Sequence, residues 1–285
     1  MGVPEERYSK IAGKNQREIC LLRAFPCAWG KCAFCDYIED NGRDTQAMVS
    51  LNHQVLQQVT GEFGVLEVIN SGSCFELPEE TLDEIAEVIR EKKIRKLFFE
   101  AHWMYRNHLE KMRRRMPVPI VFKTGVETFD YDFRERVLNK HADFTEPEQV
   151  AKYFDSPCLM VGIKGQTKDM IRYDIQCLKK YFKLGTVNVY NNNTTSIRRD
   201  EELVAWFMEE YRWLLDDPSV EVRGMSFVLQ GEQATWLHGS CSVLHGSCSV
   251  LHESCSVLHG SGFVLHRTNP VLQGQNRLLI NSGIP

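Results

Sequence analysis

Six short apolar runs alternate with amphipathic segments between residues 17 and 210, and this alternation constrains the fold more than any other feature. The runs are typical of buried strands and cover 18–23 (EICLLR), 65–69 (VLEVI), 96–100 (KLFFE), 120–122 (IVF), 158–163 (CLMVGI) and 186–190 (TVNVY). Segments such as 78–92 place apolar residues at helical spacing behind an acidic first turn. Strands and helices in alternation predict an α/β fold, with a parallel sheet closed or partly closed into a barrel.

The last part of the chain has a different character. From Leu237 onward a seven-residue unit recurs as LHGSCSV, LHGSCSV, LHESCSV and LHGSGFV. Its adjacent Val and Leu do not occupy the separated core positions of a coiled coil. The Cys and His ladder could chelate metal, but the composition favours a low-complexity tail, unstructured or not native to the domain. We therefore expect an N-terminal segment (1–16), a barrel domain (17–222) and a repeat tail (223–285).

Charge and composition narrow the class of protein. The formal net charge of −4 over 285 residues argues against a nucleic-acid-binding protein, which needs a surplus of Lys and Arg. Residues 1–16 do not form a signal peptide, and no run approaches the roughly 18 apolar residues of a membrane span. We expect a cytoplasmic protein, in which ten cysteines indicate metal binding, redox chemistry or burial rather than disulfides.

Three cysteines follow the first predicted strand, in the segment 23–41 (RAFPCAWGKCAFCDYIEDN). Cys27, Cys32 and Cys35 have the spacing C-x4-C-x2-C, and three such thiolates can ligate three irons of a 4Fe-4S cubane and leave the fourth open. An open iron can bind S-adenosylmethionine and pass an electron to its sulfonium. Zinc would need a fourth ligand, and no suitable pair follows within the domain. Three structural cysteines are the alternative.

This loop resembles that of the radical S-adenosylmethionine superfamily, including the aromatic Phe34 directly before the third cysteine. The usual spacing there is C-x3-C-x2-C, so the extra residue between Cys27 and Cys32 is typical of variant members and argues against the best-characterised subfamilies. The resemblance spans roughly residues 17–215. It implies a partial (β/α)6 TIM-like barrel that holds a 4Fe-4S cluster and S-adenosylmethionine and uses a 5′-deoxyadenosyl radical.

Segments after the later strands extend the resemblance to the cofactor site. The segment 70–73 (NSGS) stands where the superfamily grips the methionyl amino group, 125–128 (GVET) resembles a stretch near the ribose and the cluster, and 160–165 (MVGIKG) resembles the glycine motif against adenine. The asparagines after the sixth strand could also bind polar groups of the cofactor, or simply form a turn. The cofactor-binding candidates are Phe34, Asn70, Ser71, Gly72, Ser73, Glu127, Gly162, Gly165 and Asn191.

Longer segments resemble the bacterial queuine lyases of queuosine salvage. They are EICLLRAFPCAWGKCAFCDYIEDN, INSGSCFELPEET, FFEAHWMYR and FKTGVETFDYDFRE. Members of that family cleave the free base queuine into an aminomethyl-7-deazaguanine precursor and a cyclopentene-derived fragment. The resemblance implies a carbon–nitrogen lyase with a small nucleobase substrate and an electron donor such as flavodoxin or ferredoxin. A radical enzyme acting on tRNA or on another small molecule, and a non-catalytic metal-binding protein, are the alternatives.

Residues after the third and fourth predicted strands are candidates for binding such a base. Its pyrimidine edge carries N–H donors that one carboxylate can accept, and Glu100 and Glu127 each follow a strand. Glu100 could instead form a salt bridge to a lysine. The further substrate-binding candidates, for stacking on the base or binding the cyclopentene diol, are His102, Trp103, Tyr105, Tyr131 and Asp132. Cys74 is a candidate hydrogen donor, although free cysteines are more often buried in a core.

Overall fold

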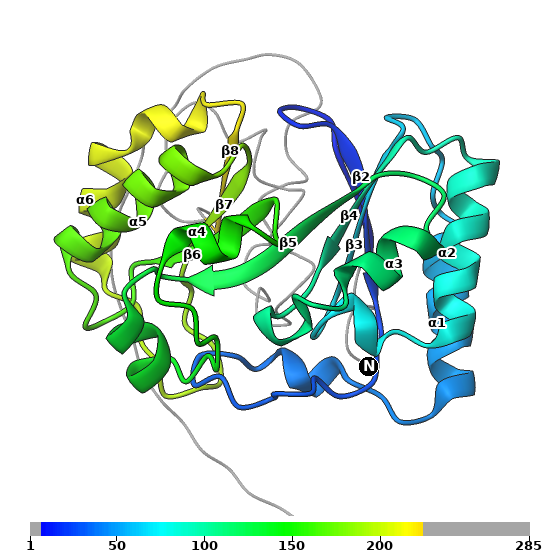
Figure 1. The fold of residues 1–285 in the computed structure, drawn as a ribbon, viewed down its shortest axis with the longest axis horizontal. Coiled ribbons are helices and arrows are strands. Elements are labelled where there is room, and N and C mark those ends of the chain that lie inside the picture. The colour runs from blue at the N-terminus through cyan, green and yellow to red at the C-terminus, as the bar shows by residue number, and fades with distance from the viewer. Residues whose placement is uncertain (1–6, 225–285) are drawn as a thin grey trace, which may run out of the picture. The chain divides into compact units, whose positions relative to one another are not determined.

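The computed structural model describes residues 7–224, which contain an eight-stranded sheet with helices outside it (Figure 1). The strands lie in chain order and are β1 (Tyr8–Ile11), β2 (Arg17–Leu22), β3 (Val65–Asn70), β4 (Lys96–Glu100), β5 (Ile120–Glu127), β6 (Ser156–Val161), β7 (Gly185–Val189) and β8 (Val220–Arg223). All pairs from β2 to β8 are parallel, and β1 pairs antiparallel with β2. The sheet curls into an open half-barrel, which confirms the predicted partial barrel.

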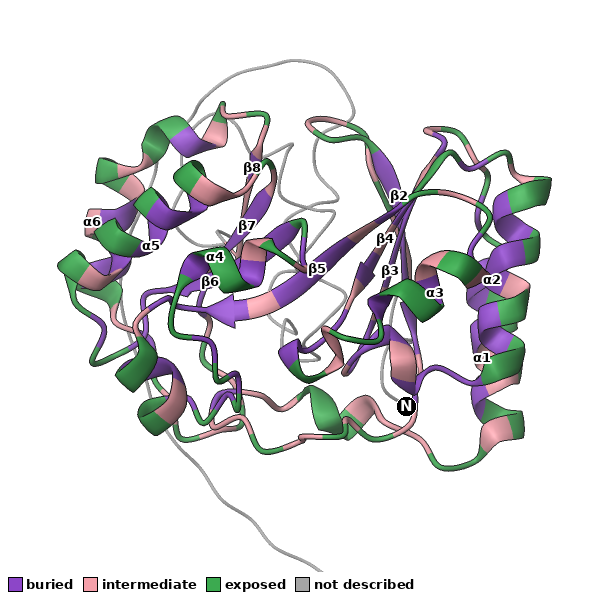
Figure 2. Ribbon diagram, in the orientation of Figure 1, coloured by how far each residue is buried: buried purple, intermediate pink, exposed green. Residues whose placement is uncertain are grey.

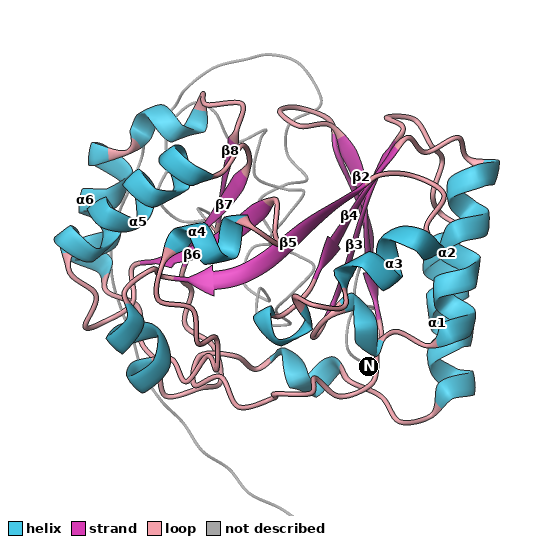
Figure 3. Cartoon of the chain, in the orientation of Figure 1, coloured by secondary structure: helices cyan, strands magenta, loops and turns pink. Residues whose placement is uncertain are grey.

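The helices connect successive strands on the outer face of the sheet (Figure 3). They are α1 (Thr45–Leu56), α2 (Glu79–Glu91), α3 (Leu109–Arg115), α4 (Pro147–Ala151), α5 (Lys168–Tyr181) and α6 (Glu201–Glu210). Side-chain caps begin several of them, as at Asp44, Thr167 and Asp200, where a side-chain oxygen accepts a hydrogen bond from the first helical turn. No helix among the described residues is long and apolar enough to cross a membrane.

The strands separate an apolar outer face from a polar inner face. On β4, Leu97 and Phe99 belong to the hydrophobic core beneath the helices. Alternation along the strand therefore turns Phe98 and Glu100 to the inside of the half-barrel. The same alternation brings Lys123 to the inner face of β5. Figure 2 shows that the strands are largely buried, so polar residues on the inner face lie in a shielded space at the centre of the fold.

The sheet extends beyond the predicted domain at one edge. All six predicted strands are present, but β1 lies within the segment 1–16 and pairs with β2 from Tyr8↔Cys20 to Ile11↔Arg17. Residues 8–11 of that segment are therefore part of the sheet. The repeated tail and its Cys/His ladder lie outside the described residues.

Candidate active site

The three cysteines lie on the loop between β2 and α1, which runs along the lower edge of the view in Figure 1. Cys27, Cys32 and Cys35 are all free thiols of intermediate exposure. The backbone N–H of Cys35 donates to the carbonyl of Cys32 at 3.2 Å, so the C-x2-C part forms a tight turn. This geometry leaves the thiols accessible at the carboxyl ends of the strands, where ligands bind in barrels of this type.

The donor set fits a cluster better than a single ion. Among residues 7–224, no three His, Cys, Asp or Glu side chains converge closely enough to hold one metal ion. In a cubane cluster each thiolate binds a different iron, so the three sulfurs stand apart around the cluster. Three thiols spread over one accessible loop satisfy that requirement.

Residues from a distant part of the chain support this loop from one side. The indole Nε1 of Trp29 donates to the carbonyl of Asn139 at 2.8 Å, and the amide Nδ2 of Asn139 donates to the carbonyl of Lys31 at 2.7 Å. The Trp29 ring also stacks on His141, with ring centroids 4.1 Å apart. The segment after β5 therefore fixes the first half of the cysteine loop.

The loop after β7 supports the other half. The amide Nδ2 of Asn193 donates to the carbonyl of Phe34 at 2.6 Å, and the Thr194 hydroxyl donates to Asp36 at 3.1 Å. Asn191, the predicted cofactor residue, instead accepts from the Arg199 guanidinium at 2.6 Å. Of the asparagines after this strand, Asn193 is therefore the one that touches the cysteine loop.

Glu76, which the sequence analysis did not identify, joins the cysteine loop to the loop after β3. Its buried carboxylate accepts from the backbone N–H of Ala28 at 3.1 Å and from the backbone N–H of Ser73. The Ser71 hydroxyl adds a hydrogen bond to Asn41 at 2.5 Å. The predicted cofactor loop and the cysteine loop thus form one hydrogen-bonded unit.

The loop after β3 also has a buried acceptor without a hydrogen-bond partner. The side chain of Asn70 donates from Nδ2 to the carbonyl of Ser73 at 3.0 Å, while its Oδ1 is buried without a hydrogen-bond partner. A Cβ atom on Gly72 would lie only 2.6 Å from Glu76 Oε2 and 3.4 Å from the Cβ of Cys27, so the Glu76 carboxylate occupies the space beside this glycine. A ligand that offers an N–H donor beside the first cysteine, such as the amino group of S-adenosylmethionine, fits this arrangement.

A buried ion pair follows β5. Glu127 has a positive φ of 63° and accepts from the Lys140 ammonium at 2.7 Å. A Cβ on Gly125 would overlap both members of the pair, so a larger residue there would displace the Glu127 carboxylate and the Lys140 ammonium. Burial disfavours the charged ammonium, but Glu127 and the neighbouring Cys32 hold the pKa of Lys140 above its usual value. Lys140 therefore brings a fixed positive charge beside the thiols, a feature that the sequence analysis missed.

A small apolar cluster forms the wall beside the cysteines. Phe34 is buried in it together with Phe133, Leu138, Met160, Ile163 and Tyr190, and Cys32 and Cys35 pack against it. Gly162 has a φ of 85°, and a side chain there would overlap Val204 of α6. Gly165 faces Phe133, which a Cβ would approach to 3.3 Å. The predicted adenine-side glycines therefore let the chain turn tightly behind Phe34.

The aromatic residues predicted to stack on a base are engaged in packing instead. Trp103 lies in the main core, with its Nε1 donating to Asp143 at 2.5 Å. Tyr105 stacks on Phe75 at a centroid distance of 4.8 Å, and its hydroxyl donates to Glu76 at 3.0 Å. Trp103 is therefore engaged in the core, while Tyr105 is half-buried, and its stacking on a base stays a prediction.

His102 is also part of the scaffold. Its ring Nε2 lies 2.9 Å from the carbonyl of Lys140, and its backbone N–H donates to the hydroxyl of Ser73 at 2.9 Å. Burial, reinforced by the Lys140 charge, lowers the pKa of His102 to about 4. A neutral His102 therefore connects the loops after β3 and β5 rather than offering a charge to a substrate.

The remaining candidates fall into two groups. Tyr131 and Asp132 are exposed, and Asp132 forms an ion pair with Arg136 at 3.2 Å. Cys74 is fully buried in the main hydrophobic core. The structure therefore does not support Cys74 as a hydrogen donor, because its thiol packs among apolar side chains.

Glu100 is the predicted substrate residue that has a free acceptor on the inner face. Its side chain is 30% exposed, and its one ion pair among the described residues is to Lys123 at 3.3 Å. Glu127, by contrast, forms a buried ion pair with Lys140. Of the two carboxylates considered for the base, Glu100 is the one available to a ligand.

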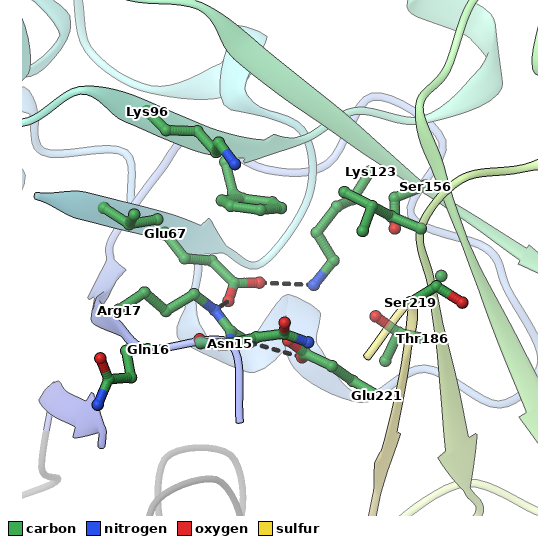
Figure 4. Close-up of a pocket in the computed structure, with 14 residues that line it drawn as sticks. Asn15, Gln16, Arg17, Glu67, Lys96, Lys123, Ser156, Thr186, Ser219 and Glu221 are labelled. Carbon is green, nitrogen blue, oxygen red and sulfur yellow. Dashed lines mark hydrogen bonds and ion pairs between the residues drawn. The ribbon is translucent and has the colours of Figure 1, made fainter. Parts of the chain in front are cut away.

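A pocket of about 140 Å³ lies at the opposite, amino ends of the strands (Figure 4). Its lining includes the first residues of several strands, among them Arg17, Val65, Lys96 and Ser156. The predicted site residues follow the other ends of these strands. The cysteine loop, the Asn70 loop and Glu100 therefore form a candidate site distinct from this pocket.

Asp174, which supports the segment after β5, makes the stability of the fold depend on pH. Asp174 of α5 accepts from the backbone N–H of Phe129 at 2.6 Å and from the Thr128 hydroxyl at 3.1 Å, while its Oδ2 is buried without a partner. Burial raises the pKa of Asp174 from 3.8 to about 7. Between these two values the folded protein retains a proton that the unfolded chain releases, so stability falls as pH rises from 4 to 7.

Replacing Asp174 with Asn is expected to remove this dependence, because the amide cannot ionise. The free energy of unfolding of the variant, relative to the wild type, should rise by about 2–4 kcal/mol between pH 4 and pH 8. Anaerobic thermal unfolding across that range measures the difference. A difference that stays constant with pH would show that Asp174 is ionised throughout.

Comparisons with known proteins were made against this geometry. No protein-family model and no curated protein sequence matches the chain. Among solved structures, the chain is 53% identical to a queuine lyase from Clostridium spiroforme bound to S-adenosylmethionine and queuine, with a TM-score of 0.76. The match covers 77% of this chain and 96% of that one. A crystal structure of SuiB from Streptococcus suis matches at 13% identity and a TM-score of 0.48, over 71% of this chain and 48% of that one.

Proposed function

The chain belongs to the queuine lyase family of radical S-adenosylmethionine enzymes, and we propose that it cleaves the free base queuine to the aminomethyl-7-deazaguanine precursor in queuosine salvage. The observation that carries this function is the 53% identity over nearly the whole length of a relative that binds both S-adenosylmethionine and queuine. Its cofactors are a 4Fe-4S cluster and S-adenosylmethionine. Its substrate is a small nucleobase, as the sequence predicted.

Cys27, Cys32 and Cys35 hold the cluster in this proposal. Their thiols are free and accessible, and the loop that carries them is fixed from both sides by Asn139 and Asn193. When bound, the cluster and S-adenosylmethionine supply a 5′-deoxyadenosyl radical that abstracts a hydrogen atom from the substrate. The protein residues bind and orient the two molecules for that event.

The loop after β3 binds the methionyl part of S-adenosylmethionine. The unpaired Oδ1 of Asn70 accepts from the amino group, and Gly72 leaves room for the Glu76 carboxylate beside Cys27. Glu76 keeps this loop and the cysteine loop at a fixed separation. The wall formed by Phe34 and the turn at Gly162 and Gly165 borders the adenosyl part.

Lys140 and Glu127 act on the electrostatics of the cluster site and take no direct part in the reaction. A cluster with three thiolates adds negative charge to a partly buried space, which is unfavourable without a compensating cation. The Lys140 ammonium lies among these groups and is held there by Glu127. We assign Lys140 the role of offsetting this charge.

Glu100 binds the pyrimidine edge of queuine. A carboxylate has about four lone-pair sites, so it can accept two N–H bonds from the base while it stays paired with Lys123. Glu100 is the last residue of β4 and lies on the inner face, at the same end of the sheet as Asn70. The base is thereby oriented with its substituent toward the cofactor.

A reductant of the flavodoxin or ferredoxin type and a cytoplasmic location complete the proposal, because accessible thiols persist in a reducing compartment. The function is tested with the full chain, reconstituted with iron and sulfide without oxygen, reduced, and given S-adenosylmethionine and queuine. Chromatography should detect 5′-deoxyadenosine and the aminomethyl-7-deazaguanine base in equal amounts. Deoxyadenosine without the base would leave a radical enzyme with another substrate.

The repeat tail requires one control in that experiment. The matched 77% of this chain already accounts for 96% of the queuine lyase from Clostridium spiroforme, so much of the remainder has no counterpart there. A chain that ends after Gly224 should give the same two products. If only the shortened chain is active, the tail blocks the site; if neither is active despite full iron content, queuine is not the substrate.

A further inference from the structure

A buried carboxylate on the inner face of β3 is surrounded by cations. Glu67 is fully buried and accepts from Arg17 at 2.5 Å, from Lys123 at 2.5 Å and from Arg223 at 3.1 Å. Figure 4 shows Arg17 and Lys123 pointing toward Glu67 from different strands. A carboxylate with three cations at contact distance is strongly anchored, since removal of any partner would leave charge unpaired in a buried space.

The network extends across the opening of the half-barrel. Glu221 on β8 accepts from Arg17 of β2 at 2.6 Å and from Arg223 at 2.9 Å. Strands near the two edges of the sheet are thus linked by ion pairs. Both oxygens of Glu67 accept hydrogen bonds and its side chain is only 1% exposed, so Glu67 is not available to a ligand.

Lys123 is the member of the network that reaches the substrate carboxylate. It stands directly opposite Glu100 in the parallel register of β4 and β5, and its ammonium lies 3.3 Å from Glu100 and 2.5 Å from Glu67. A lysine ammonium on a flexible stem fixes a partner poorly unless it is itself held. Here Glu67 holds it, and the Lys123 side chain is only 4% exposed.

We propose that Lys123 is a positioning residue for substrate recognition: anchored by Glu67, it holds the Glu100 carboxylate in the orientation that receives the N–H edge of the base. This inference rests on the proposed role of Glu100. The other charged or ionisable groups near Glu100 are Arg223, Tyr37, Cys74 and Cys158. Lys123 forms an ion pair with Glu100 at 3.3 Å, so we expect it to influence the orientation of this carboxylate.

A double-mutant cycle tests the proposal with the reconstituted full chain. Lys123→Met should weaken queuine binding by about 10- to 100-fold, raise KM more than it lowers kcat, and leave iron content and S-adenosylmethionine binding unchanged. Lys123→Arg should restore binding to within about threefold, because it keeps both charge contacts. In the Glu100→Gln background, Lys123→Met should have almost no additional effect on binding, because Lys123 acts through Glu100.

The outcomes separate this inference from the function on which it rests. If Glu100→Gln leaves queuine binding intact, the assignment of Glu100 itself is wrong. If Glu100→Gln weakens binding and Lys123→Met adds its full effect on top, Lys123 acts independently and the positioning role is overturned. The control is Lys96→Met. Lys96 is an exposed lysine at the start of β4, so this variant should bind queuine and S-adenosylmethionine and hold iron as the wild type does.

If the Lys123→Met variant folds poorly, Lys123→Gln can replace it. Glutamine also removes the positive charge, but its amide can still donate to Glu67. Thermal unfolding and iron content identify this case. A Gln variant that folds, holds iron and binds queuine as the wild type does would also overturn the proposal.

Discussion

Replacing Cys32 with Ala is expected to abolish formation of both products. Two thiolates hold a cubane cluster poorly, and the radical depends on a cluster whose three protein-bound irons leave the fourth free for S-adenosylmethionine. We expect iron content to fall below half of the wild-type value and deoxyadenosine formation to fall by more than about 1,000-fold. Iron analysis, the visible absorption of the cluster and chromatography of the reaction measure these losses.

The matched control is Cys177→Ala. Cys177 is buried in the core on α5, so its loss should cost about 1–2 kcal/mol of stability and leave iron content unchanged. A Cys32 variant that keeps a full cluster and forms both products would show that the ligand set is wrong. Loss of iron in both variants would indicate general destabilisation instead of ligand loss.

The barrel was predictable because several of its central strands contain apolar runs that are buried. The pattern of β6 is buried at every position from Ser156 to Val161, and such runs bounded by polar segments indicate parallel strands. The two additional strands, β1 and β8, contain four residues each and are mostly of intermediate exposure. Short edge strands such as YSKI and VEVR carry no apolar run, so pairing with a neighbour, which a sequence does not display, decides their structure.

The candidate cysteine ligands stand out in the sequence for a different reason. Their spacing within a single loop is local, and so is the position of Phe34 before the third cysteine. The residues that support them are not local: Glu76 bonds to Ala28, which lies 48 positions earlier, and Asn193 bonds to Phe34, which is 159 positions away. Such contacts become visible only when the sheet brings the strand ends together.

The aromatic segment after β4 shows the opposite error. Tyr105 and Trp103 have the composition of a base-stacking surface, but composition does not tell which way a short 3-10 turn faces. The turn Trp103–Tyr105 directs Trp103 into the core beside Phe144, at a centroid distance of 5.3 Å. Glu100, three residues before the turn, still lies on the inner face. The change of chain direction between Glu100 and Trp103 therefore leaves Glu100 on the inner face and places Trp103 in the core.

Glu100→Gln is expected to weaken binding of queuine by about 100-fold with little change in S-adenosylmethionine binding. Glutamine keeps the size of the side chain but places an N–H group where the base presents its own N–H donors, so one donor is left unpaired. The same loss is expected for the product base, which carries an identical pyrimidine edge. Anaerobic equilibrium dialysis with each base measures both affinities, with iron content as a check on the fold.

Comparing the affinities for queuine and for the product base identifies which part of queuine Glu100 contacts. Equal losses for substrate and product place the carboxylate on the pyrimidine edge, because that edge is the part they share. A loss confined to queuine would place Glu100 on the cyclopentene side and contradict the assignment. Glu62→Gln is the control: its ion pair with Lys10 is exposed at the surface, and such pairs contribute little, so affinity for both bases should stay at the wild-type value.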